Sequence, residues 1–375
     1  MPERMKVIRK LEARKGLEVT EIPIPTVSRD EVLIKVEAAS ICGTDLHIFH
    51  WDEWSQHRIR PPLTIGHEFC GTVAEVGDEV HNIVVGQFVS AESHVTCGMC
   101  FQCRTGQAHL CPRTKILGVD REGCFAEYVS VPEKVVWLND RRKLTPRIAT
   151  LQEPFGNAVF ATTAHDLAGQ SVAILGCGPI GCFSIGIVKS SGAAGVFASD
   201  IIDFRLDLAQ QMGATGLVNA GRDNAVRKII ELNDGYPVDI VLEMSGAPAA
   251  VRDAFSMVRN GGTVTLFGIP AKPVEIDVAE KMIFKNVTVL AMNGRRIFET
   301  WYRTRWLLES GVVDLDPLVT HVLDMEQIED AMNLIDAGKA CKIVLIPHGA
   351  DAASGKTDAA SVTEHPIEIE RPLHP

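Results

Sequence analysis

Hydrophobic positions in roughly the first 150 residues come in short β-type runs, which is typical of a sheet that is not purely parallel. Examples are Val32–Val36 and Gly71–Val76, and glycine, proline and aspartate separate such runs. The second example is followed directly by the turn Gly77-Asp78. We therefore expect the N-terminal part of the chain to be rich in β-strands.

The pattern changes from about Ser171, where apolar runs alternate with helical stretches, as in parallel βαβ units. The expected strands are Ser171–Leu175, Gly195–Ser199, Val238–Leu242 and Thr263–Phe267, and the expected helices include Gly181–Ser190 and Asp203–Met212. After about Met292 the chain returns to mixed structure, with a helix near Phe298–Glu309 and a final strand at Lys342–Ile346.

This division predicts two domains, as expected for a chain of 375 residues. One domain comprises residues 1–157 and 294–348, and a parallel-sheet domain of the doubly wound Rossmann type comprises residues 158–293. Residues 349–375 contain little apolar sequence, so we expect them to form a flexible tail.

Composition and charge exclude several classes of binding partner. The net charge of -11 argues against nucleic acid or an anionic membrane as a partner, because both require a basic face. No apolar run approaches the roughly 20 residues that cross a bilayer, and the N-terminus lacks the apolar core of a signal peptide. The 10 cysteines are therefore expected to be reduced thiols in a cytoplasmic protein.

Four cysteines lie close together as Cys-x2-Cys-x2-Cys-x7-Cys, at positions Cys97, Cys100, Cys103 and Cys111. Four thiolates can close a tetrahedral shell around zinc and leave no position for water or substrate, so we predict a structural zinc ion. The alternatives are disulfides, which need an oxidising compartment, and an iron–sulfur cluster, whose common spacings differ.

A glycine-rich turn follows the expected strand Ser171–Leu175 and opens a helix, as in dinucleotide-binding proteins. In this Gly-x-Gly-x-x-Gly pattern, Gly176 permits the tight turn and Gly178 lets the backbone approach a pyrophosphate. Gly181 lets the helix pack on the strand. The helix N-terminus would supply N–H donors to the phosphates.

Asp200 ends the next strand, where a carboxylate binds the adenine ribose and repels a 2'-phosphate. Asp200 therefore favours NAD over NADP. Arg205 complicates this choice because it could stack near adenine or pair with a phosphate, although it could also be a solvated helix-face cation.

A second group of metal-ligating residues comprises Cys42, His67 and Glu68. A catalytic zinc ion takes about three protein ligands and keeps an open position, and this set would suit it. Taken alone, the three residues are better explained as a buried cysteine and a surface histidine, because they are spread over 27 positions. Their occurrence beside the four cysteines and the glycine turn favours the metal site.

Together these motifs resemble the zinc-dependent medium-chain dehydrogenases, and the likeness extends over residues 5–347. The resemblance implies a GroES-like catalytic domain joined to the Rossmann domain. Longer segments resemble the branch of the family that oxidises L-threonine. These segments are Ile41–His47, Trp51–Gln56, Glu153–Ala158, Glu243–Pro248 and Phe298–Tyr302.

The resemblance also implies roles for single residues. Cys42, His67 and Glu68 match the catalytic zinc ligands, and Glu153 matches an acidic residue near that metal. Thr44 and His47 match a proton relay. Further matches are the cofactor contacts Ile180, Asp200, Arg205, Phe267, Gly268, Ile269, Met292 and Asn293. The pair Met292-Asn293 departs from the β-branched or aromatic residues expected there.

The activity implied is NAD-dependent oxidation of L-threonine at its 3-hydroxyl to 2-amino-3-oxobutyrate, with two zinc ions per chain. His94 is a candidate substrate contact, as are Arg295, Glu53 and the pair Trp51 and Trp54. The tryptophans could equally pack in the core, and Arg295 could be an ordinary surface or subunit-interface cation. The alternatives are a polyol or secondary-alcohol dehydrogenase, a non-catalytic protein of the same fold, and a zinc-dependent nucleic-acid binder.

The segment Lys285–Leu290 lies where the sheet edge of this family joins subunits. An unprotected edge strand invites pairing, so we expect a homo-oligomer, either a dimer or a tetramer. The alternative is an ordinary edge strand.

Overall fold

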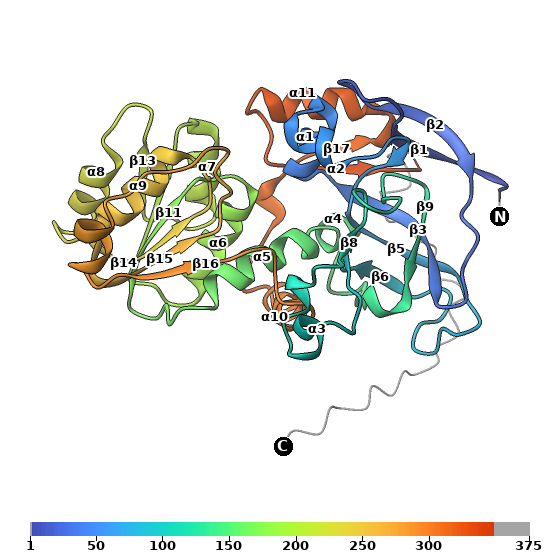
Figure 1. Cartoon of the computed structure of the whole chain (residues 1–375), viewed down its shortest axis with the longest axis horizontal. Coiled ribbons are helices and arrows are strands. Elements are labelled where there is room, and N and C mark those ends of the chain that lie inside the picture. The colour runs from blue at the N-terminus through green and yellow to red at the C-terminus, as the bar shows by residue number, and fades with distance from the viewer. Residues whose placement is uncertain (1, 349–375) are drawn as a thin grey trace, which may run out of the picture.

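The computed structural model describes residues 2–348, which form two parts that lie side by side (Figure 1). One part is built on a parallel sheet, and the other is rich in antiparallel strands. The mixed α/β fold class predicted from the sequence is therefore confirmed. The expected tail, residues 349–375, lies outside the described residues.

The parallel sheet has six strands in the order β13-β12-β11-β14-β15-β16. Its strands are β11 (Ser171–Leu175), β12 (Gly195–Asp200), β13 (Gly216–Asn219), β14 (Val238–Glu243), β15 (Val258–Leu266) and β16 (Thr288–Ala291). The connecting helices are α6 (Pro179–Ser190), α7 (Asp203–Gln211), α8 (Ala225–Leu232) and α9 (Pro248–Met257). The strand order reverses between β11 and β14, which is where doubly wound folds bind ligands.

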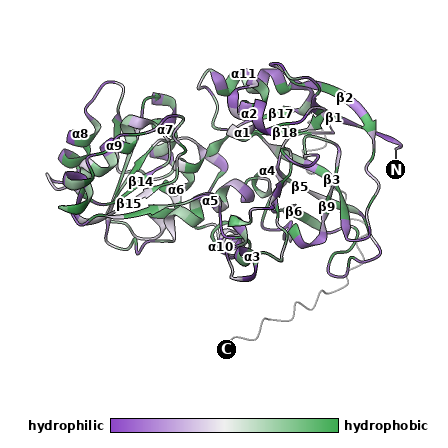
Figure 2. Cartoon of the chain, in the orientation of Figure 1, coloured by the Kyte–Doolittle hydropathy of each residue, from purple (hydrophilic) through white to green (hydrophobic). Residues whose placement is uncertain are grey.

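Strand β11 is buried along its whole length, as expected for a central parallel strand covered by helices on both faces. Hydrophobic sequence runs through this sheet and the helices beside it (Figure 2). Helix α6 begins at Pro179, two residues before the predicted start, because proline suits the first turn of a helix.

The main sheet of the other part has seven strands, six of them in the order β10-β6-β5-β3-β18-β17, while β9 also pairs with β3. Its strands are β3 (Glu31–Ser40), β5 (Glu68–Val76), β6 (Phe88–Ala91), β9 (Tyr128–Pro132), β10 (Val136–Leu138), β17 (Val319–Asp324) and β18 (Lys342–Ile346). A smaller sheet contains β1 (Arg4–Lys10), β2 (Glu18–Pro23) and β4 (Leu63–Thr64). Strands β17 and β18 follow the parallel sheet in sequence, so the chain crosses back to the first part. The predicted domain division requires this return, and its boundary residues remain a prediction.

A single hydrophobic core crosses the junction between the two parts. Helix α5 (Gln152–Thr162) packs against α6 and α10 (Glu299–Glu309), and the rings of Phe155 and Phe183 meet edge to face at 5.5 Å. Ala38 and Val344 of the β-rich sheet belong to the same buried cluster as Ile174 of the parallel sheet. No helix within residues 2–348 is long and apolar enough to cross a membrane.

The glycine turn gives a direct test of this packing. A Cβ atom at Gly181 would lie 1.9 Å from the Gly176 carbonyl oxygen, whereas a Cβ at Gly178 would meet nothing within 4 Å. We expect Gly181→Ala to lower the free energy of unfolding by about 1–3 kcal/mol because the backbone must shift. The matched variant Gly178→Ala should stay within about 0.5 kcal/mol of the wild type. Chemical unfolding checks both values, and equal stabilities of the two variants would contradict the packing described.

Candidate active site

The four clustered cysteines lie on a lobe between β7 (His94–Val95) and β8 (Lys115–Ile116) that includes the short helix α3 (Phe101–Arg104). Their sulfur atoms all lie within 4.8 Å of one another. The Sγ–Sγ distances are 3.4 Å for Cys100 and Cys103, 3.6 Å for Cys97 and Cys111, and 4.0 Å for Cys97 and Cys103.

These distances fit a metal better than disulfides. Four sulfurs at about 2.3 Å from one zinc ion are about 3.8 Å apart in a tetrahedron. A disulfide would bring two sulfurs to about 2.05 Å, and all ten cysteines are free thiols. The donor set is closed, so the lobe suits a structural zinc ion.

The second predicted metal group is brought together by strand register. Ser40 at the end of β3 pairs with Glu68 at the start of β5, which places Cys42 beside His67 and Glu68. One donor atom from each of these three residues lies within 4.8 Å of the others. Cys42 is also the N-cap residue of helix α1 (Gly43–His50).

Two donor atoms of this group are buried without any hydrogen-bond partner, namely His67 Nδ1 and Glu68 Oε1. Because unpaired buried polar atoms are costly, these two atoms are well suited to bind a cation. The other oxygen of Glu68 accepts hydrogen bonds from Lys342 Nζ and Ser40 Oγ. Lys342 also donates to the Ile41 carbonyl at 2.7 Å. One carboxylate oxygen is thus fixed by the protein, and the other is left for a metal.

Asp45 belongs to this site and was not predicted from the sequence. It is fully buried, and its Oδ2 accepts from the Cys42 backbone N–H at 2.9 Å. Its Oδ1 lies 4.0 Å from His67 Nδ1, too far for a hydrogen bond. Burial raises the pKa of Asp45 to about 6. The signal in the sequence is its place three residues after Cys42, in a helix capping box.

A third cluster surrounds Arg295, which is almost fully buried. Its guanidinium binds both oxygens of Glu92, and Nη2 also donates to Glu153 Oε1 at 2.7 Å. Ser93 Oγ donates to the same Glu153 oxygen at 2.6 Å, and His94 Nδ1 lies 2.9 Å from Glu92 Oε1. Arg295 is therefore engaged by carboxylates of the protein rather than free to receive one from a substrate.

The charges of this cluster stabilise each other. Burial alone would raise the pKa of the Glu92 carboxyl, but Arg295 and His94 hold it well below its ordinary value. Glu153 also has a lowered pKa, because Arg295 and His67 outweigh the effect of burial. Both acids are therefore ionised near neutral pH. The predicted substrate residue His94 is partly exposed at the edge of this cluster.

The predicted dinucleotide contacts lie at the carboxyl ends of the parallel strands. Gly176 has a left-handed φ of 94°, and Gly178 directly precedes α6. Asp200 Oδ2 accepts from the Cys177 N–H at 2.7 Å, which ties the end of β12 to the glycine turn. Arg205 Nη1 lies 3.8 Å from the same oxygen.

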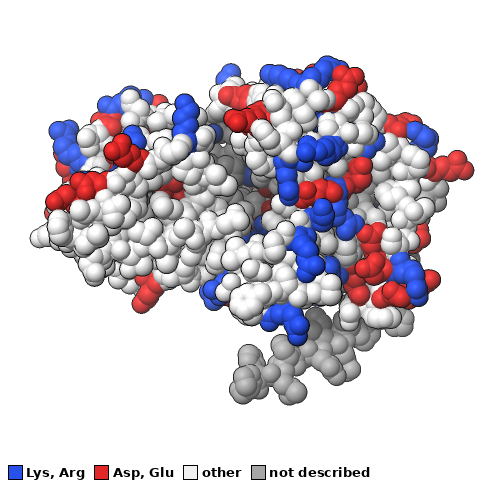
Figure 3. All heavy atoms as spheres, in the orientation of Figure 1, with Lys and Arg blue, Asp and Glu red and all other residues white. Residues whose placement is uncertain are grey.

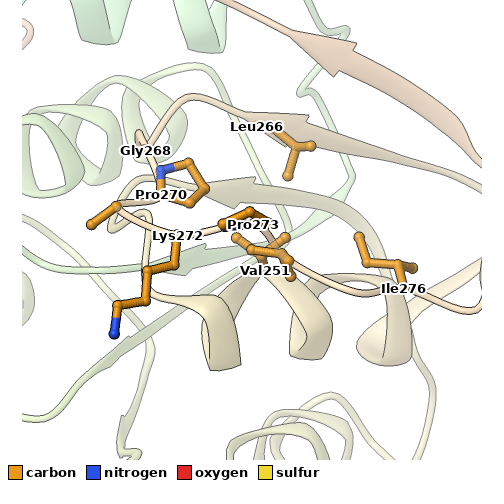
Figure 4. Close-up of a pocket in the computed structure, with 9 residues that line it drawn as sticks. Val251, Leu266, Gly268, Pro270, Lys272, Pro273 and Ile276 are labelled. Atoms are coloured by element: carbon orange, nitrogen blue, oxygen red, sulfur yellow. The ribbon is translucent and has the colours of Figure 1, made fainter.

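The remaining predicted contacts are placed along this edge. Ile180 lies in the first turn of α6, Phe267, Gly268 and Ile269 follow β15, and Met292 and Asn293 follow β16. A pocket of about 480 Å³ adjoins Gly268 and is lined mainly by apolar side chains, among them Val251 and Leu266 (Figure 4). The Lys272 ammonium points away from it. This pocket contains none of the predicted metal ligands.

The predicted relay residues lie on α1. Thr44 Oγ1 is 3.8 Å from Cys42 Sγ, and His47 is one turn further along the helix, where it is exposed. His47 Nδ1 meets Asp52 Oδ2 at 2.5 Å, a contact that the sequence did not reveal. Of the other substrate candidates, Trp51 packs against the core, whereas Trp54 is exposed near His47.

Two family models match this chain, one mainly in the β-rich part and one mainly in the parallel-sheet part. The family model of the alcohol dehydrogenase GroES-like domain matches residues 28–140, and the zinc-binding dehydrogenase model matches residues 179–309. A relative from Symbiobacterium thermophilum, named L-threonine 3-dehydrogenase, is 48% identical over 92% of this chain and 99% of its own length. This chain belongs to the zinc-binding dehydrogenase family.

A Bacillus subtilis relative of this zinc-binding dehydrogenase, also named L-threonine 3-dehydrogenase, is 43% identical over 92% of this chain and 99% of its own. Among solved structures, 2R,3R-butanediol dehydrogenase from Bacillus subtilis has a TM-score of 0.82 at 29% identity, covering 92% of this chain and all of its own. An alcohol dehydrogenase from E. coli in complex with NADH has a TM-score of 0.83 at 28% identity, with the same coverage. The predicted family and GroES-like fold are confirmed.

The buried pair of Glu68 and Lys342 in this dehydrogenase can be tested by substitution. We expect Lys342→Met to lower the free energy of unfolding by about 3–5 kcal/mol, because it leaves a buried carboxylate without its cation. The control is Arg222→Gln, which removes an exposed pair with Asp203 and should leave the free energy of unfolding close to that of the wild type. Chemical unfolding of the two variants measures both costs. If Lys342→Met were as stable as the control, Glu68 would not depend on this cation.

Proposed function

We propose that this dehydrogenase catalyses the NAD-dependent oxidation of L-threonine at its 3-hydroxyl to 2-amino-3-oxobutyrate. The main support is the 48% identity to the Symbiobacterium relative over nearly its entire length. The site geometry supports the reaction type, because an open three-residue metal group and a dinucleotide turn occur in one chain.

The catalytic zinc ion would be held by Cys42, His67 and Glu68, and a structural zinc ion by the four-cysteine lobe. When bound, the catalytic zinc polarises the substrate hydroxyl and the nicotinamide accepts the hydride. Lys342 and Ser40 orient Glu68 toward the metal group. Arg295 and Ser93 hold one oxygen of Glu153, so we assign Glu153 to a role beside the metal rather than to permanent ligation.

Thr44 and His47 would carry the substrate proton to solvent, which suits a histidine because it can exchange protons near neutral pH. His94 would contact the substrate, with its ring oriented by Glu92. The dinucleotide would be bound by the separate predicted contacts at the ends of the parallel strands, of which Gly176 is the first in the chain and Asn293 the last.

NAD is the proposed dinucleotide because Asp200 is held with both oxygens at the end of β12. A carboxylate there repels a 2'-phosphate. Arg205 forms an ion pair with Asp200, so the carboxylate partly neutralises the guanidinium charge that a phosphate would need. One similar structure contains NADH and another contains NADP, so the comparisons are compatible with either.

We also propose a homo-oligomer, a dimer or tetramer, in the cytoplasm. Strand β16 is one of the two edge strands of the parallel sheet. The side chains of Val289 in this strand and of Val278, Ile283 and Phe284 just before it are apolar and exposed. Such surfaces favour association. The free cysteines suit a reducing compartment. Lysine, arginine and acidic side chains are interspersed on the face shown in Figure 3, which does not favour nucleic acid as a partner.

A polyol or secondary-alcohol dehydrogenase is the second candidate, because the butanediol dehydrogenase of Bacillus subtilis shares the fold. Its identity to this chain is 29%, compared with 48% for the relative named for threonine.

The metal content tests the proposed sites. We expect two zinc ions per chain in the purified enzyme, and one in Cys103→Ser, which breaks the closed thiolate set. The control Cys124→Ser changes a buried thiol outside both groups and should retain two. Elemental analysis measures the ratio. One zinc ion per wild-type chain, removable without loss of turnover, would contradict a catalytic role for the metal.

The substrate is tested by kcat/KM for L-threonine, sorbitol, xylitol and 2,3-butanediol with NAD. We expect L-threonine to be preferred by at least about tenfold, because even a modest difference of 1.4 kcal/mol in transition-state binding gives that ratio. A zinc chelator should abolish NADH formation. A higher kcat/KM for a polyol would replace the proposal with the second candidate.

A further inference from the structure

The turn between α1 and α2 (Glu53–Arg58) brings an acid onto the exposed histidine of α1. Helix α1 ends at His50, and Trp51 adopts a left-handed conformation with φ 58° and ψ 46°. This conformation is uncommon for a residue other than glycine. It reverses the chain at once, so that Asp52 returns to His47, the residue one turn earlier on the same helix.

The two carboxylate oxygens of Asp52 have different hydrogen-bond partners. Its Oδ1 accepts from the Ser55 backbone N–H at 3.0 Å and so caps α2, while Oδ2 lies 2.5 Å from His47 Nδ1. The Ser55 backbone N–H and His47 lower the pKa of Asp52 against the opposing effect of its partial burial. An ionised carboxylate only accepts hydrogen bonds, so the neutral His47 ring carries its hydrogen on Nδ1. Its Nε2 is then left free to accept a proton.

Among the described residues, Asp52 is the charged group that contacts the His47 ring. The other neighbour of the ring is Trp54, with centroids 6.0 Å apart, which carries no charge. The second histidine of the helix, His50, faces Asp336 of α11 (Ile328–Asp336) instead. Thr44 lies three residues before His47, on the same face of the helix, and contacts Cys42.

We propose that Asp52 is a positioning residue of the proton path, which fixes His47 with Nε2 available as the acceptor. The inference rests on the proposed function. A proton released from the substrate side is taken up by Nε2, the imidazolium is stabilised by the Asp52 carboxylate, and the proton then passes from the exposed ring to water. A carboxylate is needed for this role, whereas any good capping residue could start α2.

That difference gives the test. Asp52→Ser keeps a side-chain oxygen that caps a helix but removes the carboxylate from His47. The matched control is Asp336→Asn, which removes the acid facing the other histidine of α1. Both are compared with the wild-type holoenzyme in kcat, KM, melting temperature and the transient rate of NADH formation.

We expect Asp52→Ser to lower kcat by roughly three- to thirtyfold, less than the full range for acid–base catalysis because the pair is partly exposed. KM and melting temperature should change little, and raising the concentration of a non-chelating buffer base should restore much of the rate. Asp336→Asn should match the wild type.

A rate for Asp52→Ser within twofold of the wild type would overturn the inference. A fall in kcat that buffer base does not restore would also overturn the inference. So would a fall in kcat that comes with a clear drop in melting temperature. Either result would leave Asp52 as a helix cap alone. The assay uses whichever alcohol the wild type oxidises. Absence of threonine turnover would therefore refute the proposed function, while the effect of Asp52 is still measured on the alternative substrate.

Discussion

The active site depends on pairing buried carboxylates with buried cations. Glu68, Glu92 and Glu153 are all nearly inaccessible to solvent, and an isolated ionised carboxylate costs several kcal/mol to bury. Lys342 pairs with the first, and Arg295 with the other two. Both cations come from the part of the chain that follows the last strand of the parallel sheet, β16. The charge balance of the site is therefore completed only when the chain crosses back between the two parts.

This pairing also separates the roles of the acids near the metal group. Glu68 has one oxygen held by Lys342 and Ser40 and the other unpaired, as a metal ligand requires. Glu153 already satisfies one oxygen with Arg295 and Ser93. The difference favours Glu68 over Glu153 as the proposed third zinc ligand, and a zinc ion with three protein ligands would keep one position for a substrate oxygen.

Motifs that are local in sequence could be predicted, because short-range geometry determines them. The sulfur atoms of the four cysteines lie together on one lobe, as predicted. The strand Ser171–Leu175 has the predicted bounds, and the glycine turn after it leads into α6 as expected. The ion pairs that balance the buried carboxylates could not be predicted, because they join residues far apart in the sequence. Lys342 is 274 positions from Glu68, and Arg295 is 203 positions from Glu92. No spacing rule links such residues, so only the tertiary fold reveals them. The sequence leaves Arg295 as a candidate substrate contact, because its partners Glu92 and Glu153 are distant in the chain.

The most direct test of the account is the position of the metal ions. Diffraction from crystals of the enzyme at the zinc absorption edge would place each ion without reference to activity. The account predicts two anomalous peaks per chain, one among the four cysteine sulfurs and one bound by Cys42, His67 and Glu68, with Glu153 still paired to Arg295. A single peak in the cysteine lobe, with no metal at the Cys42 group, would contradict it.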